Sequence, residues 1–417
     1  AFDEWMNFDQ FLNGELERIQ SAGLRRFLRG LESPQGPEVT CDGRLLANFS
    51  SNDYLGLAAH PKIRNAAHDA LEGAGAGAGA SRLVCGTHRH HLRLEESLAR
   101  FKQTEAALSF SSGYSAALGT IPTLAGKNDV IIMDKLCHAC LVDGARLSGA
   151  SIRVFPHNRL EKLEDHLRWA AETRPAARVL VLVESVYSMD GDRAPLPEIV
   201  ELKDRFGAWL FVDEAHGIGV VGKQGRGLAG EAGIASRIEV QMGTLGKALG
   251  SSGAYICGSA ALRDYLINRA RSFIFSTAPP PHCAAASCAA VELLEAEEGE
   301  ALVRKLQENI ATLASGLSAP AQSAIFPVIV GDEELAMDAS RSLLAESFLV
   351  PAIRYPTVAR GSARLRITVT AAHHREMIER LATAVALRRS GHGRILSTGA
   401  RIGDANSPSS LEISGRD

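Results

Sequence analysis

The stretch Trp209-Leu210-Phe211-Val212-Asp213-Glu214-Ala215-His216-Gly217 is the most informative part of the chain. Its apolar first half predicts a strand that is buried on both faces, and Asp213 stands where this strand ends. Ligands of open α/β sheets bind outside the carboxyl ends of the strands. Asp213 is therefore a candidate for metal binding, for general-base catalysis or for pairing with a protonated ring nitrogen.

Similar apolar runs alternate with helical patterns on both sides of this stretch, from about residue 45 to residue 286. The segments 159–170 and 196–206 have helical spacing. This alternation predicts an α/β fold with a mostly parallel central sheet and helices on both faces. The expected strands are Ala106–Phe110, Val130–Met133, Ser151–Phe155, Val179–Glu184, Ala208–Asp213, Glu239–Gly243 and Gly253–Cys257.

The two ends of the chain have a different character. Residues 8–31 have the spacing of a charged helix, and strand patterns at 326–330 and 364–369 with a helix over 376–388 predict a smaller C-terminal α+β domain. We therefore expect four parts. They are an N-terminal helix and arm over 1–55, a large domain over 56–285, a small domain over 286–389, and a polar, flexible tail over 390–417.

Composition argues against several function classes. The net charge of −3 comes without a basic stripe, which disfavours a nucleic-acid partner. A membrane span needs roughly 20 consecutive apolar residues, and the longest runs here have only the length of strands. Seven scattered cysteines, and a start without a secretory signal, favour the cytoplasm. Cys137 and Cys140 have C-x-x-C spacing, but His138 between them favours two small buried residues over a redox or metal pair, so no metal is expected.

Lys247 follows the strand expected at 239–243 and lies in a glycine-containing segment, Thr244–Gly250. A lone lysine after a strand is usually a solvated charge. Pyridoxal 5'-phosphate (PLP), however, needs an amine that forms a Schiff base and a carboxylate that keeps the pyridine nitrogen protonated. Lys247 and Asp213 together therefore predict PLP as the cofactor.

The phosphate and the ring of such a cofactor need further partners. Ser111–Ser115 follow one strand and precede a helical run, where free N–H groups attract an anion, although a simple serine-rich turn fits as well. His216 could reach the phenolic oxygen of the cofactor, or be a structural histidine. His138 could stack on the ring, or be a core or capping histidine.

The ordered motifs of the chain resemble the α-oxoamine synthase family of fold-type I PLP enzymes. This resemblance implies an aspartate aminotransferase-like fold and a PLP-dependent acyltransferase that forms a C–C bond. The matching segments, in the order of the family over about residues 8–388, are Asn48–Leu57, Gly79–Arg82, Cys85–Thr87, Ser112–Tyr114, Ser188–Asp192, Asp213–Gly217, Gly225–Gly227, Thr244–Lys247 and Arg364–Arg366.

The resemblance also implies roles for single residues. Lys247 is the Schiff-base lysine and general base, Asp213 pairs with the pyridine nitrogen, and His138 stacks on the ring and borders the substrate. Arg366 binds the amino-acid carboxylate, with Asn52 also on the substrate, whereas Arg25 and Thr357 lie on the acyl-CoA side. The residues implied to hold the cofactor are Ser112, Gly113, Tyr114, Ser188, His216 and Thr244, with Ser276 and Thr277 from the second subunit of a homodimer.

Within the family, the chain is most similar to the branch that acts in biotin biosynthesis. This implies decarboxylative condensation of L-alanine with an acyl-CoA, pimeloyl-CoA by preference. Segments 82–87 and 244–250 are also similar to the branch that uses glycine and acetyl-CoA, and serine with a long acyl-CoA is a further alternative. A PLP-binding regulator without turnover is disfavoured, because such proteins carry a DNA-binding domain and no spare domain is visible here.

Overall fold

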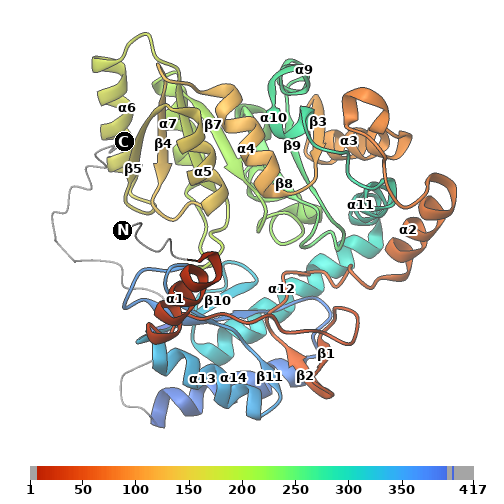
Figure 1. Ribbon diagram of the computed structural model, residues 1–417, viewed down its shortest axis with the longest axis vertical. Coiled ribbons are helices and arrows are strands. Elements are labelled where there is room, and N and C mark those ends of the chain that lie inside the picture. Colours follow the sequence, from red (N-terminus) through yellow and green to blue (C-terminus); the bar gives the residue numbers. More distant parts are fainter. Residues whose placement is uncertain (1–6, 392–396, 399–417) are drawn as a thin grey trace.

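The computed structural model describes residues 7–391 and 397–398. Nearly all of the tail predicted over 390–417 lies outside these residues. Figure 1 shows a larger unit built on a twisted sheet and a smaller unit beneath it, with α11 (Pro281–Leu294) and α12 (Glu297–Leu317) leading from one to the other. Among the described residues, no helix combines the length and the apolar character needed to cross a bilayer.

The large sheet has seven strands in the order β3-β9-β8-β7-β6-β4-β5. Only β9 is antiparallel to its neighbours, β3 and β8, and the other pairs are parallel. All seven strands were predicted, and their ends differ from the prediction by at most one residue. The strands are β3 (Ala106–Phe110), β4 (Val130–Asp134), β5 (Ser151–Phe155), β6 (Val179–Glu184), β7 (Trp209–Asp213), β8 (Val240–Thr244) and β9 (Ala254–Gly258).

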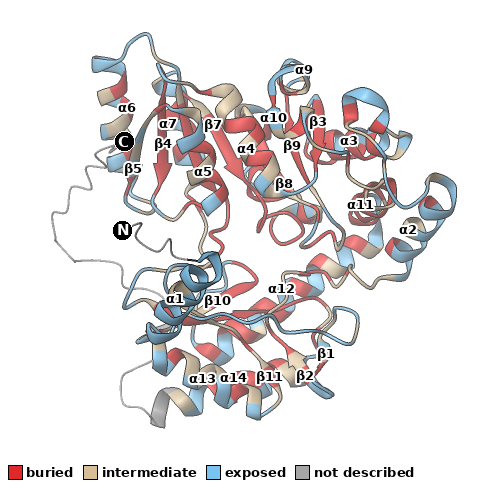
Figure 2. Cartoon of the chain, in the orientation of Figure 1, coloured by how far each residue is buried: buried red, intermediate tan, exposed pale blue. Residues whose placement is uncertain are grey.

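Both faces of this sheet are covered by helices, as Figure 2 shows by the buried strands between them. In β7, Leu210 and Val212 belong to one core cluster and Phe211 to the other, so alternate residues of one strand fill two cores. The helices of this unit are α2 (Pro61–Ala74), α3 (Arg89–Phe101), α4 (Gly113–Leu124), α5 (Ala139–Ser148), α6 (Leu160–Thr173), α7 (Leu196–Arg205), α8 (Leu228–Glu231), α9 (Ala260–Arg269) and α10 (Arg271–Ile274).

The smaller unit contains an antiparallel sheet of order β12-β13-β10-β14, packed with α12, α13 and α14. A second, three-stranded sheet pairs β1 and β2 of the N-terminal arm with β11 of the C-terminal region. The elements are β1 (Glu38–Cys41), β2 (Arg44–Asn48), β10 (Ile325–Gly331), α13 (Glu333–Ala345), β11 (Phe348–Leu349), β12 (Ala352–Ile353), β13 (Ala363–Thr368), α14 (Arg375–Gly391) and β14 (Ser397–Thr398).

The helix predicted over 8–31 is too long. The helix α1 spans Phe8–Ser21, and the chain leaves it through Gly23, whose φ is +68°. A positive φ at a glycine is a common end for a helix. Within the described chain, α1 buries none of its side chains, and Phe8 and Phe11 are exposed.

Candidate active site

Two carboxylates lie side by side at the carboxyl edge of the large sheet. Glu184 ends β6 and Asp213 ends β7, and the two residues are partners in the strand register. Both are buried, and burial raises the pKa of each, with the neighbouring Asp213 charge raising that of Glu184 further. The sequence analysis missed Glu184, although its position as the last residue of a predicted strand was a usable signal.

Lys247 lies in a tight turn after β8, beside these carboxylates. The backbone N–H of Gly250 donates to the Lys247 carbonyl at 2.9 Å, which closes the turn. Burial lowers the pKa of Lys247, and the charges of Asp213 and Glu184 oppose this shift. The structure therefore brings the predicted lysine and aspartate into one electrostatic environment, with an amine that loses its proton more easily than a solvated one.

His216 lies between Lys247 and Tyr54. Its Nε2 lies 2.9 Å from Lys247 Nζ, and its Nδ1 lies 2.7 Å from the hydroxyl of Tyr54. Burial and the charges of Lys247 and Arg366 hold the pKa of His216 well below its usual range. Tyr54, which the sequence analysis did not assign, therefore contacts a predicted cofactor residue.

Arg366 completes this group of residues from β13 of the smaller unit. Its Nη1 donates to Asn52 Oδ1 at 3.2 Å, and its Nε donates to the Ser188 carbonyl at 2.7 Å. The Tyr54 hydroxyl also donates to Asn52 Oδ1, at 3.1 Å. The predicted residues Asn52, Ser188 and Arg366 thus meet at the same place, between the two units.

His138 stands at the start of α5, on the same edge of the sheet. Its Nδ1 accepts from the Cys140 N–H at 3.2 Å, and its own N–H donates to Glu184 Oε1 at 2.6 Å. Desolvation lowers the pKa of His138, which favours the neutral imidazole, although the residue as a whole is exposed. Capping of the helix and an exposed ring face are compatible, and stacking on a cofactor stays a prediction. All seven cysteines lie in the described part of the chain and are free there.

The N-terminus of α4 lies against the end of β8. Ser112 caps the helix by accepting the Ser115 N–H at 3.1 Å. A Cβ at Gly113 would come within 2.8 Å of Thr244 Cγ2, so glycine permits the close approach. The buried Thr244 hydroxyl has no hydrogen-bond partner among residues 7–391 and 397–398. An unsatisfied hydroxyl beside a helix N-terminus fits an anion such as a phosphate.

Three further predicted residues, Tyr114, Ser276 and Thr277, have other partners among the described residues or none. Tyr114 hydrogen-bonds Asp143 of α5. Thr277 forms a β-bridge with Ser81, and in the described chain no hydrogen bond joins Ser276 or Thr277 to the group around Lys247.

Arg25 and Thr357 lie on neighbouring exposed segments. The Arg25 carbonyl accepts from Arg354 Nη2 at 3.1 Å, and Arg26 Nη2 donates to the Thr357 hydroxyl at 3.4 Å. These contacts bring together the two residues implied to lie on the acyl-CoA side.

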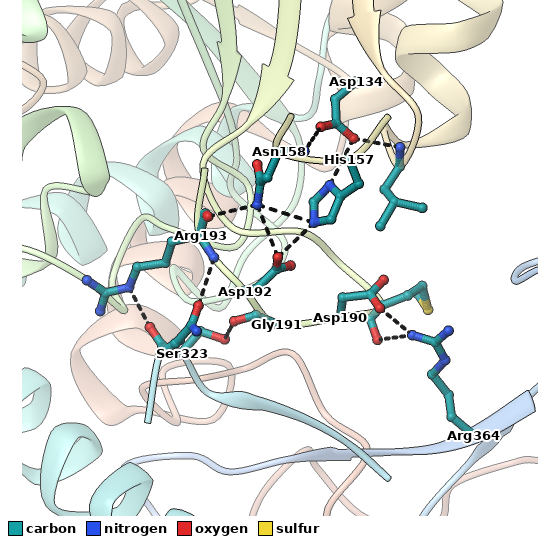
Figure 3. A network of polar contacts seen from close by, with 12 residues as sticks. Asp134, His157, Asn158, Asp190, Gly191, Asp192, Arg193, Ser323 and Arg364 are labelled. Carbon is teal, nitrogen blue, oxygen red and sulfur yellow. Dashed lines mark hydrogen bonds and ion pairs between the residues drawn. The ribbon is translucent and has the colours of Figure 1, made fainter. Parts of the chain in front are cut away.

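The segment from Ser188 to Arg193 joins the two units, and Figure 3 shows the contacts of its residues 190–193. On the side of the large sheet, His157 Nε2 lies 2.7 Å from Asp192 Oδ2 and its Nδ1 lies 3.0 Å from Asp134 Oδ1. On the other side, Arg364 Nη1 donates to Asp190 Oδ1 at 2.6 Å, and the Ser323 hydroxyl donates to the Gly191 carbonyl at 2.6 Å. The sequence analysis missed this joint, which holds the Ser188 carbonyl that binds Arg366.

Comparisons with known proteins agree with this geometry. Residues 46–385 match the family described as aminotransferase class I and II. The 8-amino-7-oxononanoate synthase of Geobacter sulfurreducens is 49% identical over 379 residues, which cover 89% of this chain and 96% of that protein. The solved serine palmitoyltransferase of S. paucimobilis with bound PLP has a TM-score of 0.86 at 29% identity, over 93% of this chain and 99% of that one. The solved 8-amino-7-oxononanoate synthase of Francisella tularensis has a TM-score of 0.69 at 27% identity, over 83% and 99%.

The solved serine palmitoyltransferase superposes better than the solved 8-amino-7-oxononanoate synthase, whereas the relative that is 49% identical in sequence is an 8-amino-7-oxononanoate synthase. A shared fold hosts different chemistries, so the sequence match carries more weight for the branch than the superposition does. The predicted resemblance to α-oxoamine synthases, the biotin branch and fold type I are confirmed. The chain belongs to the aminotransferase class I and II family.

Proposed function

We propose that this chain is a PLP-dependent acyltransferase that condenses L-alanine with pimeloyl-CoA and releases CoA, CO2 and 8-amino-7-oxononanoate in biotin biosynthesis. The observation that carries the proposal is the near full-length match to a curated relative of that name. The site supports it, because Lys247, Asp213 and Arg366 converge between the two units.

The residues present fit PLP. The unpartnered Thr244 hydroxyl and the N-terminus of α4 would hold the phosphate, Asp213 would face the ring nitrogen, and Lys247 would hold the aldehyde carbon. When bound, PLP supplies an aldehyde that condenses with amino groups and a ring that withdraws electrons from the adjacent substrate carbon. The pKa of Asp213 is raised by burial in the free chain, and a cationic ring nitrogen beside it would favour the ionised carboxylate.

Lys247 is the group that moves protons. Because burial lowers the pKa of its amine, a larger share of Lys247 is uncharged near neutral pH and can take the proton from the alanine Cα. The Cα then bonds to the thioester carbonyl carbon and the C–S bond breaks, so CoA leaves as a thiolate that takes a proton from solvent. Loss of the carboxylate as CO2 and return of a proton from Lys247 to Cα complete the balance.

Arg366 orients the alanine through its carboxylate. Its fork of N–H donors is already positioned by the Ser188 carbonyl and Asn52 Oδ1, so little side-chain freedom is lost on binding. On the acyl-CoA side, the exposed Arg25 and Arg26 near Thr357 suit the phosphates of CoA.

A homodimer in the cytoplasm forms part of the proposal. Phe8 and Phe11 of α1 are exposed to solvent, and Phe275, next to Ser276, is 72% exposed. Exposed apolar side chains of this kind mark surfaces that a partner covers. A second copy of the chain would bury them and bring its Ser276 and Thr277 to the phosphate.

The test combines each of several amino acids with each of several acyl-CoA thioesters and measures the rate of CoA release for every pair. We expect the highest kcat/KM for L-alanine with pimeloyl-CoA. A large preference for glycine with acetyl-CoA, or for serine with palmitoyl-CoA, would refute the substrate assignment and leave the family assignment in place.

A further inference from the structure

We infer that Tyr54 is a positioning residue whose hydroxyl sets which ring nitrogen of His216 carries the proton. Tyr54 is completely buried, and its hydroxyl lies between two groups that can accept its single proton. These are Asn52 Oδ1, at 3.1 Å, and His216 Nδ1, at 2.7 Å. The direction of the hydroxyl therefore decides the tautomer of the histidine.

The arginine at one end of this chain of hydrogen bonds identifies the donor in the contact between Tyr54 and Asn52. A guanidinium only donates, so the Asn52 side-chain atom 3.2 Å from Arg366 Nη1 is the amide oxygen. The same oxygen lies next to the Tyr54 hydroxyl and cannot donate, so Tyr54 donates to Asn52. With its proton given to Asn52, the Tyr54 oxygen can only accept from His216, which places a proton on Nδ1.

A charged lysine at the other end fits the same arrangement. With Nδ1 protonated and the ring neutral, His216 Nε2 has a free lone pair, and it faces Lys247 Nζ at 2.9 Å. Burial and the nearby cationic charges lower the pKa of His216, which agrees with a neutral ring. A proton on Nε2 would instead place two donors opposite each other whenever the lysine is charged.

The arrangement can reverse by a rotation of one O–H bond. A phenolate oxygen, the partner that the sequence analysis proposed for His216, only accepts, so it would require the proton on Nε2. Tyr54 can supply this tautomer by turning its hydroxyl from Asn52 to Nδ1. The turn frees one lone pair on Asn52 Oδ1 next to Arg366. This second step rests on the proposed function, whereas the tautomer in the cofactor-free chain does not.

The experiment is 15N NMR of histidine-labelled protein without cofactor, in which His216→Gln identifies the signals of His216. We expect the wild type to show a protonated Nδ1 and an unprotonated Nε2. Asn52→Ala removes the competing acceptor and is expected to move the proton to Nε2, and Tyr54→Phe to mix the two forms. Tyr255→Phe is the matched control, because it removes a buried hydroxyl that has no partner among the described residues, and it should leave His216 unchanged.

A wild type with the proton on Nε2 would overturn the inference, as would Asn52→Ala and Tyr54→Phe proteins that keep the wild-type pattern. The wild-type spectrum tests the claim even if a variant does not fold. Addition of PLP to the wild type should move the proton to Nε2. Failure of that step alone would overturn the coupling to the cofactor, but not the role of Tyr54 in the free chain.

Discussion

Two histidines near the same edge of the large sheet have opposite acid–base properties. His157 is held between Asp134 and Asp192, and although burial opposes it, these two hydrogen bonds raise its pKa to about 10. His216 has Tyr54 and Lys247 as partners, and burial with the neighbouring cations keeps its pKa well below the usual range.

The difference separates a joint from an active site. In the His157 cluster, charges meet opposite charges within the chain, which stabilises the fold. Around Lys247, the buried carboxylates of Glu184 and Asp213 have no ion pair with the amine among the described residues, and the proposed cofactor would supply partners for these groups. Both clusters contain buried polar atoms without a partner among the described residues, such as Asp192 Oδ1 and Thr244 Oγ1, so it is the ion pairs of His157 that distinguish the joint.

The largest effect should come from Lys247→Ala. Because this amine is the proposed proton carrier and cofactor attachment point, we expect CoA release from alanine and pimeloyl-CoA to fall by about 10⁴-fold or more. Borohydride should no longer fix PLP to the protein. Lys162→Met, which breaks an exposed ion pair with Asp165 outside the site, is the control and should keep activity within about threefold. Undiminished turnover by the Lys247 variant would remove the lysine from the mechanism.

Asp213→Asn should separate activity from stability. The amide is neutral and cannot keep a ring nitrogen protonated, so we expect kcat to fall by about 10³-fold. Removal of a charge that burial disfavours should leave the cofactor-free chain as stable as the wild type, or more stable by about 1 kcal/mol. Urea unfolding without PLP measures this, and a loss of several kcal/mol would show that Asp213 belongs to a structural cluster.

His157→Gln should show the reverse pattern. It leaves Asp134 and Asp192 without their shared cation, so we expect a loss of about 2 kcal/mol in unfolding free energy and only a small change in kcat. A pKa that is higher in the folded than in the unfolded chain gives stability that is complete below the unfolded pKa of about 6.5 and declines as pH rises toward 10. Urea unfolding from about pH 6 to about pH 10 should therefore show a decline in the wild type that the variant lacks.

The sequence predicted those features of the two clusters that depend on residues close together in the chain. Continuous apolar runs revealed the strands, and Asp213 was visible because it ends one of them. The His157 cluster was missed because His157 and Asp192 are 35 residues apart and meet only through the strand order. Tyr54 was missed because it lies in a loop, and its partner His216 comes 162 residues later.

Two buried hydroxyls should give the smallest effects and the most direct contrast. Ser323 donates to the Gly191 carbonyl and accepts from the Ile325 N–H, so Ser323→Ala should cost about 1 kcal/mol of unfolding free energy and leave PLP affinity unchanged. Thr244 has no partner within the described ranges, so Thr244→Val should keep the cofactor-free stability within about 0.5 kcal/mol, because no hydrogen bond is lost. The same variant should weaken PLP binding by about tenfold, since one charge-assisted hydrogen bond to the phosphate would be missing. Urea unfolding measures the stability of each variant without cofactor, and PLP titration measures its affinity for PLP. A loss of stability in Thr244→Val with unchanged PLP affinity would place Thr244 with the joint rather than with the site.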